Sequence, residues 1–366
     1  MTVFKGLSLR LVSTLMVANL VSACVPGPEV RQPVQVRPPV FVPEKPVRPV
    51  QPTINRHDVA PAALAQTIRS LWINFNGKVG IAVARMDGSW MIEHRGGEMM
   101  PQQSVSKFWV ALTLLDGVDA GRINLNESVT VKKSDLTVFH QPIAALVDDD
   151  GYQTTLASLL NRAMTQSDNT ANDFLLRRAG GPDAVRAFIS ANGLGAIRFG
   201  PGEKYLQAGT AGLTWKSDYS VGRAFQAARA KLTLEERQAA FERYLADPVD
   251  GAAPVAVVRA LLKLKRGDLL RPESTRLLLS LMANSATGKS RLRGGVPLGW
   301  GFAHKTGTGQ DLNGTTAGYN DIGIMTAPDG TVYGVAVMIS RSAQPIPSRQ
   351  MLMQSVAAAI AAHHQK

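Results

Sequence analysis

The stretch QSDNTANDFLLRR, Gln166 to Arg178, is the most informative segment of this 366-residue chain for predicting its fold. Three polar residues, Ser167-Asp168-Asn169, stand directly before a helix-favouring run that begins at Thr170. A short loop between two helices can direct a hydroxyl and an amide into a cleft, while Asp168 is expected to bond its own backbone or its neighbours. The plain alternative is that the triplet only caps the following helix.

A second polar string, Ser104-Val105-Ser106-Lys107, lies upstream at the start of an apolar segment predicted to be a helix over 104–115. A serine hydroxyl is a weak nucleophile that needs a neighbouring base. Lys107 follows three residues later and so shares a helix face with Ser104. Free amide hydrogens at a helix start can also hold developing oxyanion charge. The alternative is a capping serine beside a solvated lysine.

A third string, Lys305-Thr306-Gly307-Thr308-Gly309, is predicted to lie on a strand at the edge of a sheet. A lysine there lends positive potential to an anionic substrate. Thr306 and Thr308 are two residues apart and therefore project from the same strand face. Glycines between them let a ligand approach the backbone.

In this order, the three strings resemble the S-x-x-K, S-D-N and K-T-G motifs of class A β-lactamases and penicillin-binding proteins. The similarity covers about Pro61 to Ala362, including the stretch from Ala286 to Gly307 with its Gly299-Trp300 pair. The resemblance implies an α/β (α+β) fold. Its parts would be a five-stranded antiparallel sheet flanked by helices and a mostly helical subdomain, with the site between them.

A glutamate separates class A enzymes from penicillin-binding proteins, and Glu203 is the candidate here. The run from Gly202 to Gln207 resembles the family's E-x-x-L-N and lies 36 residues after Ser167, which matches the family's spacing. A carboxylate beside an acyl-ester can activate water. Gln207 stands where the family usually has asparagine, which puts the rate of turnover in question. The alternative is a solvated loop glutamate, paired with Lys204.

The resemblance implies a role for each candidate residue. Ser104 would be acylated with help from Lys107 and Glu203, and Ser167 would protonate the leaving nitrogen. Other side chains would bind the substrate or position water, namely Asn169, Gln207, Arg291, Lys305, Thr306 and Thr308. Arg291 lies 14 residues before Lys305, where some carbapenem-hydrolysing members carry an arginine; its alternative is a solvated surface position. Phe139 or His140 would form an aromatic wall at the entrance.

The predicted function is therefore hydrolysis of the β-lactam amide through a Ser104 acyl-enzyme that Glu203-activated water releases. One alternative is a peptidoglycan D-Ala-D-Ala carboxypeptidase or a penicillin-binding protein that deacylates slowly. Another is a non-enzymatic lipoprotein that docks on the cell wall or a partner. The expected small-molecule partner is a β-lactam.

The catalytic part is predicted to span residues 56–366. Its predicted strands lie near both ends with helices between them, a pattern typical of a sheet assembled from both termini. The segment 193–212 is predicted to be a loop, and an inserted helical hairpin is expected at about 227–258. Predicted strands are 78–85, 90–94, 299–306, 319–326 and 332–340, and predicted helices include 61–75, 156–164, 170–179, 185–191 and 347–364.

The N-terminal segment predicts export. Lys5 and Arg10 precede a short apolar run from Leu11 to Ala23, the pattern of a signal peptide. Cys24, the single cysteine of the chain, ends a lipobox-like string, so residues 1–24 are interpreted as a lipoprotein signal and Cys24 as the lipidation site. An ordinary signal with an incidental cysteine is the alternative. Residues 25–55 are rich in proline and predict an extended linker.

The composition of the chain argues against several kinds of partner and cofactor. The chain carries a net charge of +12, but no Lys/Arg run with interleaved aromatics appears, so no nucleic-acid partner is expected. The six histidines form no metal-ligand spacing, so neither a metal nor another cofactor is expected. We expect a monomer in the periplasm, held to a membrane by its lipid; Val25 after the cysteine favours the outer membrane.

Overall fold

The computed structural model describes residues 60–364. The predicted signal peptide with Cys24 and the predicted linker at 25–55 lie outside the described residues. Within the described part, no helix combines the length and the apolar character needed to cross a bilayer.

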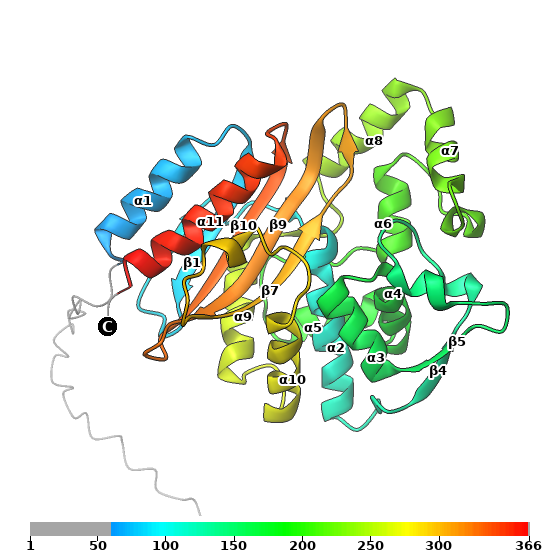
Figure 1. The fold of residues 1–366 in the computed structure, drawn as a ribbon, viewed down its shortest axis with the longest axis horizontal. Coiled ribbons are helices and arrows are strands. Elements are labelled where there is room, and N and C mark those ends of the chain that lie inside the picture. Colours follow the sequence, from blue (N-terminus) through cyan, green and yellow to red (C-terminus); the bar gives the residue numbers. More distant parts are fainter. Residues whose placement is uncertain (1–59, 365–366) are drawn as a thin grey trace, which may run out of the picture. The chain divides into compact units, whose positions relative to one another are not determined.

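A central antiparallel sheet has the strand order β2-β1-β10-β9-β7, and a short strand, β8, pairs with β9 (Figure 1). The predicted five-stranded antiparallel sheet is thus confirmed. The extra strand, β8, lies between the predicted strands at 299–306 and 319–326. The strands are β1 (Lys78–Arg85), β2 (Met91–His94), β7 (Gly301–Thr308), β8 (Asp311–Leu312), β9 (Thr315–Thr326) and β10 (Val332–Ser342).

Side chains of the sheet feed two hydrophobic cores, one on each face. Ile81 and Val83 of β1 pack into one core, and Ala82 and Ala84 pack into the other. Helices α1 (Ala62–Ile73) and α11 (Ile346–Ala362) cover the first face, and α9 (Pro254–Arg266) covers the second. Because both faces are covered, the strands are apolar at consecutive positions rather than alternating.

The second part of the domain is mostly helical, as predicted. Its centre is α2 (Lys107–Asp119), which is buried on almost every side, as expected of a helix in the interior of a domain. Around it pack α4 (Asn169–Arg178), α5 (Gly181–Ala191) and α10 (Pro272–Ala283), and α3 (Leu156–Asn161) packs against α4. Two small ladders join β3 (Met100–Pro101) to β6 (Gly251–Ala252) and β4 (Ser128–Val131) to β5 (Tyr152–Thr155).

Two helices, α7 (Ala224–Lys231) and α8 (Leu234–Ala246), occupy much of the region where a helical hairpin was expected. Thr233 starts α8 with a capping box, because its hydroxyl accepts the Glu236 N–H and its own N–H bonds the Glu236 carboxylate. Residues 254–258 instead begin α9, whose apolar face packs on the sheet. The hairpin therefore ends earlier than the predicted boundary at 258. That it is an insertion stays a prediction.

The edge strand β7 runs directly against the turn that carries Ser104. A Cβ atom added at Gly307 would overlap the carbonyl oxygen of Gln102. Only glycine permits this approach, and it brings Thr306 and Thr308 to the same cleft as Ser104.

Candidate active site

Ser104 lies in a 3-10 turn, Gln103–Ser106, so that α2 begins at Lys107 and not at Ser104 as predicted. Gln103 has a φ of +54°, a strained conformation for a residue other than glycine. The buried carboxylate of Asp250 accepts the Gln103 N–H at 2.7 Å and holds the turn in place. The Gln103 N–H, through its bond to Asp250, therefore fixes the backbone next to Ser104.

Lys107 is the centre of a buried hydrogen-bond network. Its Nζ donates to Ser104 Oγ at 2.8 Å and to Asn169 Oδ1 at 2.9 Å, and it forms an ion pair with Glu203. An ammonium group has three hydrogens, so these three acceptors use all of them. The side chain is 1% exposed, which excludes the solvated lysine.

Glu203 begins a short helix, α6 (Glu203–Thr210), inside the segment 193–212 that was predicted to be a loop. That prediction is wrong at these residues, because the residue that satisfies the helix start comes from α4. The Asp173 carboxylate accepts the N–H groups of Glu203 at 2.9 Å and Lys204 at 3.2 Å. Glu203 is 2% exposed and pairs with Lys107, which excludes the solvated alternative.

Asp173 is a site residue that sequence reasoning missed. Burial, and secondarily the neighbouring Glu203 carboxylate, raise the pKa of Asp173 to about 6. One sequence signal could have identified it: Asp173 follows Asn169 by one helical turn and shares its face of α4. It acts on the site indirectly, by holding the backbone of Glu203.

Ser167 adopts a left-handed conformation, with a φ of +62°, at the junction before α4. Asp168 accepts the N–H of Ala171 at 3.0 Å and that of Ile143 at 2.7 Å. The prediction that Asp168 bonds the nearby backbone is confirmed. This cap fixes the loop and leaves the Ser167 hydroxyl in the cavity wall.

Lys305 is fully buried behind Ser167 and does not line the cavity itself. Its Nζ donates to Ser167 Oγ at 2.9 Å and to the carbonyl of Thr306 at 3.0 Å. Burial, and next the ammonium of Lys107, bring the pKa of Lys305 well below its ordinary value. The group is therefore suited to exchange a proton with Ser167.

Arg291 is buried against the edge of the sheet and not solvated. Its Nη1 donates to the carbonyls of Gly307 at 2.9 Å and Asn320 at 2.7 Å, and its Nη2 donates to Thr308 Oγ1. The guanidinium lies 3.8 Å from the ring centroid of Tyr319. These contacts hold a positive charge at the end of the cavity formed by β7.

The Gln207 amide is held by other amides. Its Nε2 donates to Gln103 Oε1 at 3.0 Å and makes a longer contact of 3.5 Å to Glu203 Oε2. Its Oε1 accepts from Gln310 Nε2 at 3.0 Å. Both hydrogens of Gln207 Nε2 are therefore directed at protein acceptors. Sequence reasoning did not anticipate this network, since Gln103 and Gln310 are far from Gln207 along the chain.

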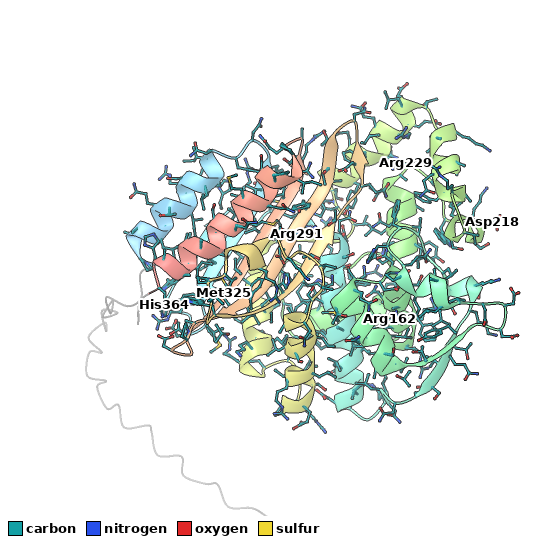
Figure 2. All side chains as sticks on the ribbon, viewed as in Figure 1. Arg162, Asp218, Arg229, Arg291, Met325 and His364 are labelled. Atoms are coloured by element: carbon teal, nitrogen blue, oxygen red, sulfur yellow. The ribbon has the colours of Figure 1, made fainter. Side chains whose placement is uncertain are left out.

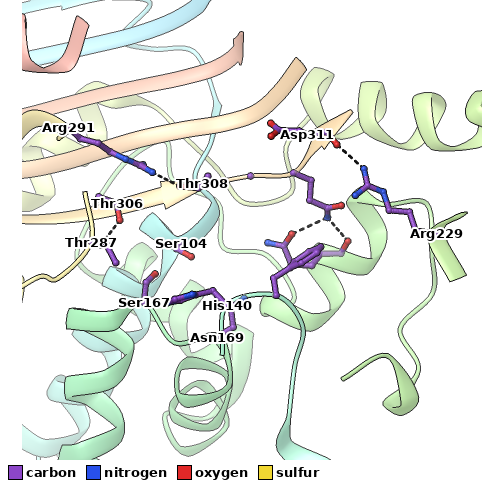
Figure 3. Close-up of a pocket in the computed structure, with 14 residues that line it drawn as sticks. Ser104, His140, Ser167, Asn169, Arg229, Thr287, Arg291, Thr306, Thr308 and Asp311 are labelled. Carbon is purple, nitrogen blue, oxygen red and sulfur yellow. Dashed lines mark hydrogen bonds between the residues drawn. The ribbon is translucent and has the colours of Figure 1, made fainter. Parts of the chain in front are cut away.

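One cavity of about 590 Å³ collects most of the predicted residues (Figure 3). The predicted residues that line it are Ser104, Ser167, Asn169, Gln207, Arg291, Thr306 and Thr308, and Phe139 and His140 are both in its wall. Lys107, Glu203 and Lys305 lie behind this surface and reach it through Ser104 and Ser167. Cys24 is outside the described residues. Across residues 60–364, no cluster of histidine, cysteine or carboxylate side chains is suited to hold a metal ion.

The arrangement provides a hydroxyl, two ammonium groups and a carboxylate within one hydrogen-bonded cleft. Such a cleft can acylate a serine and then hydrolyse the ester. Comparison with known proteins gives the same chemistry. The sequence model of the Beta-lactamase enzyme family matches residues 63–364.

Curated relatives include the extended-spectrum beta-lactamase PER-1 of Pseudomonas aeruginosa, 29% identical over 80% of this chain and 85% of the relative. Beta-lactamase VEB-1 of the same organism is 24% identical over 77% of this chain and 84% of the relative. Among solved structures, the TLA-3 extended-spectrum beta-lactamase superposes with a TM-score of 0.68 at 26% identity, covering 82% of this chain and 97% of the other.

Proposed function

The chain belongs to the beta-lactamase enzyme family and is a class A serine β-lactamase, and from that premise we propose which side chain performs each step. The observation that carries the assignment is the contact of Lys107 with both the Ser104 hydroxyl and the Glu203 carboxylate. It connects a nucleophile to a base away from bulk water.

In acylation, Ser104 Oγ attacks the carbonyl carbon of the lactam. Two proton acceptors are available along one chain of hydrogen bonds: Lys107 in its neutral form, or Glu203 with Lys107 between them. The 2.8 Å contact between Lys107 Nζ and Ser104 Oγ supports transfer in either case. The proton stays inside the site in both.

The developing oxyanion binds the backbone N–H groups of Ser104 and Thr308. Gly309 N donates to Gly318 O of β9, and successive amides of a strand point in opposite directions. The Thr308 N–H therefore points to the free edge of β7, the side on which the Ser104 turn lies. Loss of one such donor typically costs a hundredfold or more in rate, about 3 kcal/mol.

Ser167 then protonates the nitrogen that leaves when the ring opens. Lys305 restores that proton, since its Nζ lies 2.9 Å from Ser167 Oγ. The lowered pKa of Lys305 favours this role, because the group gives up a proton more readily than an exposed lysine.

The ring carboxylate of the substrate binds at the β7 end of the cavity. Arg291, Thr306 and Thr308 provide a guanidinium and two hydroxyls there, and Lys305 adds positive potential from behind. Asn169 bonds the side-chain amide of the substrate; one of its Nδ2 hydrogens already bonds Val138 O at 2.9 Å, which fixes the group.

Before deacylation, Lys107 and Glu203 release the proton taken from Ser104 and Lys305 regains the one it gave up, so that Glu203 is ionised again. Glu203 then takes a proton from water, the water oxygen attacks the ester carbonyl of acylated Ser104, and the bond between Ser104 Oγ and the acyl group breaks as the proton passes through Lys107 to Ser104 Oγ. Gln207 confines that water between Glu203 and the ester. The decisive experiment is nitrocefin turnover by the purified chain, with Ser104→Ala as the control. Hydrolysis that persists in Ser104→Ala would refute the proposed nucleophile.

The Gln207 network favours one second candidate, a penicillin-binding protein or peptidoglycan carboxypeptidase that releases penicillin slowly. With both Nε2 hydrogens directed at protein acceptors, Gln207 has no donor left for the hydrolytic water. A long-lived penicillin adduct on the unmutated protein would support this candidate. Rapid multiple turnover would exclude it.

Class A β-lactamases are generally secreted or periplasmic. We further propose that Cys24 carries lipid and anchors a monomeric enzyme to a membrane, with residues 25–55 as spacer. The lipobox-like string and the proline content support this proposal. Cys24→Ser should release the protein from the membrane fraction into the soluble periplasm, and unchanged fractionation would refute the anchor.

A further inference from the structure

The cavity wall opposite Arg291 includes an arginine from the α7–α8 hairpin. Arg229 of α7 lines the cavity, and it lies on the other side of Ser104 from Arg291 (Figure 3). Figure 2 shows the same separation, with Arg291 beside the sheet and Arg229 on the hairpin. Sequence analysis did not identify Arg229.

The Arg229 guanidinium is only partly neutralised by the protein, through the charge of Asp311. Its Nη2 donates to the backbone carbonyl of Asp311 at 2.8 Å, and its Nε is buried without a partner. Within residues 60–364 it forms no ion pair with a carboxylate. A guanidinium carries five N–H donors, so most of its capacity remains unused.

A second arginine adds to this charge. Arg237 of α8 is close enough for its charge to act on Arg229, and its Nε is likewise buried without a partner. Burial, and then Arg237, lower the pKa of Arg229, but an arginine stays protonated in proteins. The two adjacent guanidinium charges repel each other. An anion bound in the cavity next to Arg229 would reduce this repulsion and would be stabilised by both charges.

Asp311 is the acidic group that faces Arg229. Its carboxylate accepts from the Thr316 hydroxyl and is directed away from Arg229, whereas its backbone carbonyl is directed toward it (Figure 3). Asp311 also lines the cavity, so its charge offsets part of the positive charge here, but the two guanidiniums of Arg229 and Arg237 still outnumber this one carboxylate.

We propose that Arg229 is a specificity-determining residue that binds a second carboxylate, carried on the acylamino side chain of the β-lactam. This inference rests on the proposed function. The ring carboxylate occupies the Arg291 end, the scissile carbonyl lies at Ser104 and the side-chain amide lies at Asn169. The part of the substrate beyond the amide then extends toward the wall formed by Gln310 and Arg229.

The experiment compares carbenicillin with benzylpenicillin, which differ only by a carboxylate on the side-chain carbon. The readout is the ratio of kcat/KM for carbenicillin to that for benzylpenicillin. Arg229→Gln keeps a donor for the Asp311 carbonyl but removes the charge, so the ratio should fall about tenfold, equivalent to about 1.4 kcal/mol. Arg229→Lys keeps the charge and should retain most of the ratio.

Lys231→Gln is the matched control, because it removes one positive charge from an exposed position of the same helix. It should leave the ratio unchanged. A ratio in Arg229→Gln equal to that of the unmutated enzyme, with both penicillins hydrolysed, would overturn the subsite alone. Failure of the unmutated protein to hydrolyse either penicillin would refute the proposed function, and the subsite with it.

Discussion

Replacing Asp173 with asparagine tests whether a buried carboxylate holds the backbone of Glu203 at an energetic cost. Burial and the Glu203 charge raise the pKa of Asp173 from 3.8 to about 6. The folded protein therefore binds this proton more tightly than the unfolded chain does. The ionised carboxylate of Asp173 therefore lowers the free energy of unfolding. This loss is fully present above pH 6 and disappears as the pH falls toward 4.

The shift of about two pKa units corresponds to about 3 kcal/mol at pH 7 and about half of that at pH 5. Urea unfolding should measure it at both pH values. The stability of the unmutated protein relative to Asp173→Asn should rise by about 1 kcal/mol between pH 7 and pH 5.

The exposed Asp218 provides a matched control, since Asp218→Asn removes a carboxylate that water already solvates. That variant should retain the pH dependence of the unmutated protein. A stability difference between the unmutated protein and Asp173→Asn that stays constant from pH 7 to pH 5 would refute the reasoning.

Three further substitutions test separate contacts. Asp168→Ala removes two backbone hydrogen bonds, including the cap of α4, and should cost about 2 kcal/mol in urea unfolding; an unchanged midpoint would contradict the cap. Arg291→Gln should raise KM for benzylpenicillin about tenfold with a smaller change in kcat, and steady-state kinetics with an unchanged KM would argue against carboxylate binding. Lys305→Met leaves Ser167 without its ammonium partner and should slow acylation by nitrocefin about a hundredfold in stopped-flow measurements; acylation at the unmutated rate would exclude the proton relay.

The sequence predicted the elements whose signals are local. The apolar run of β1 at 78–85 was located at its observed bounds, and the three polar strings identified the Ser104 turn, the Ser167 loop and the β7 edge. Spacing and resemblance also selected Glu203, because its distance from Ser167 is set by the fold common to the family. These features depend on residues close together or on a known pattern.

What the sequence could not predict depends on contacts between distant segments. Helix α6 was expected to be a loop, since its capping carboxylate, Asp173, belongs to α4. The Gln103–Gln207–Gln310 network joins three segments with no shared pattern. Arg229 belongs to a hairpin whose helices were expected, but its approach to the cavity depends on how that hairpin packs.

The ion pair between Lys107 and Glu203 explains how the cleft can hold two charged groups away from water. Lys107 and Glu203 neutralise each other. Removing either partner leaves an uncompensated buried charge, which typically costs about 3–5 kcal/mol of folding stability. Variants at these positions therefore need a folding control, such as circular dichroism, before a loss of activity is assigned to chemistry.

The central claim is that a single carboxylate, Glu203, activates the water that frees Ser104. Intact-protein mass spectrometry with peptide mapping tests it directly, after benzylpenicillin is added to Glu203→Ala and to the unmutated enzyme. We predict that the variant retains the mass of one intact penicillin on Ser104 while the unmutated enzyme returns to its free mass. Turnover by Glu203→Ala at the unmutated rate, with no adduct on Ser104, would contradict the account.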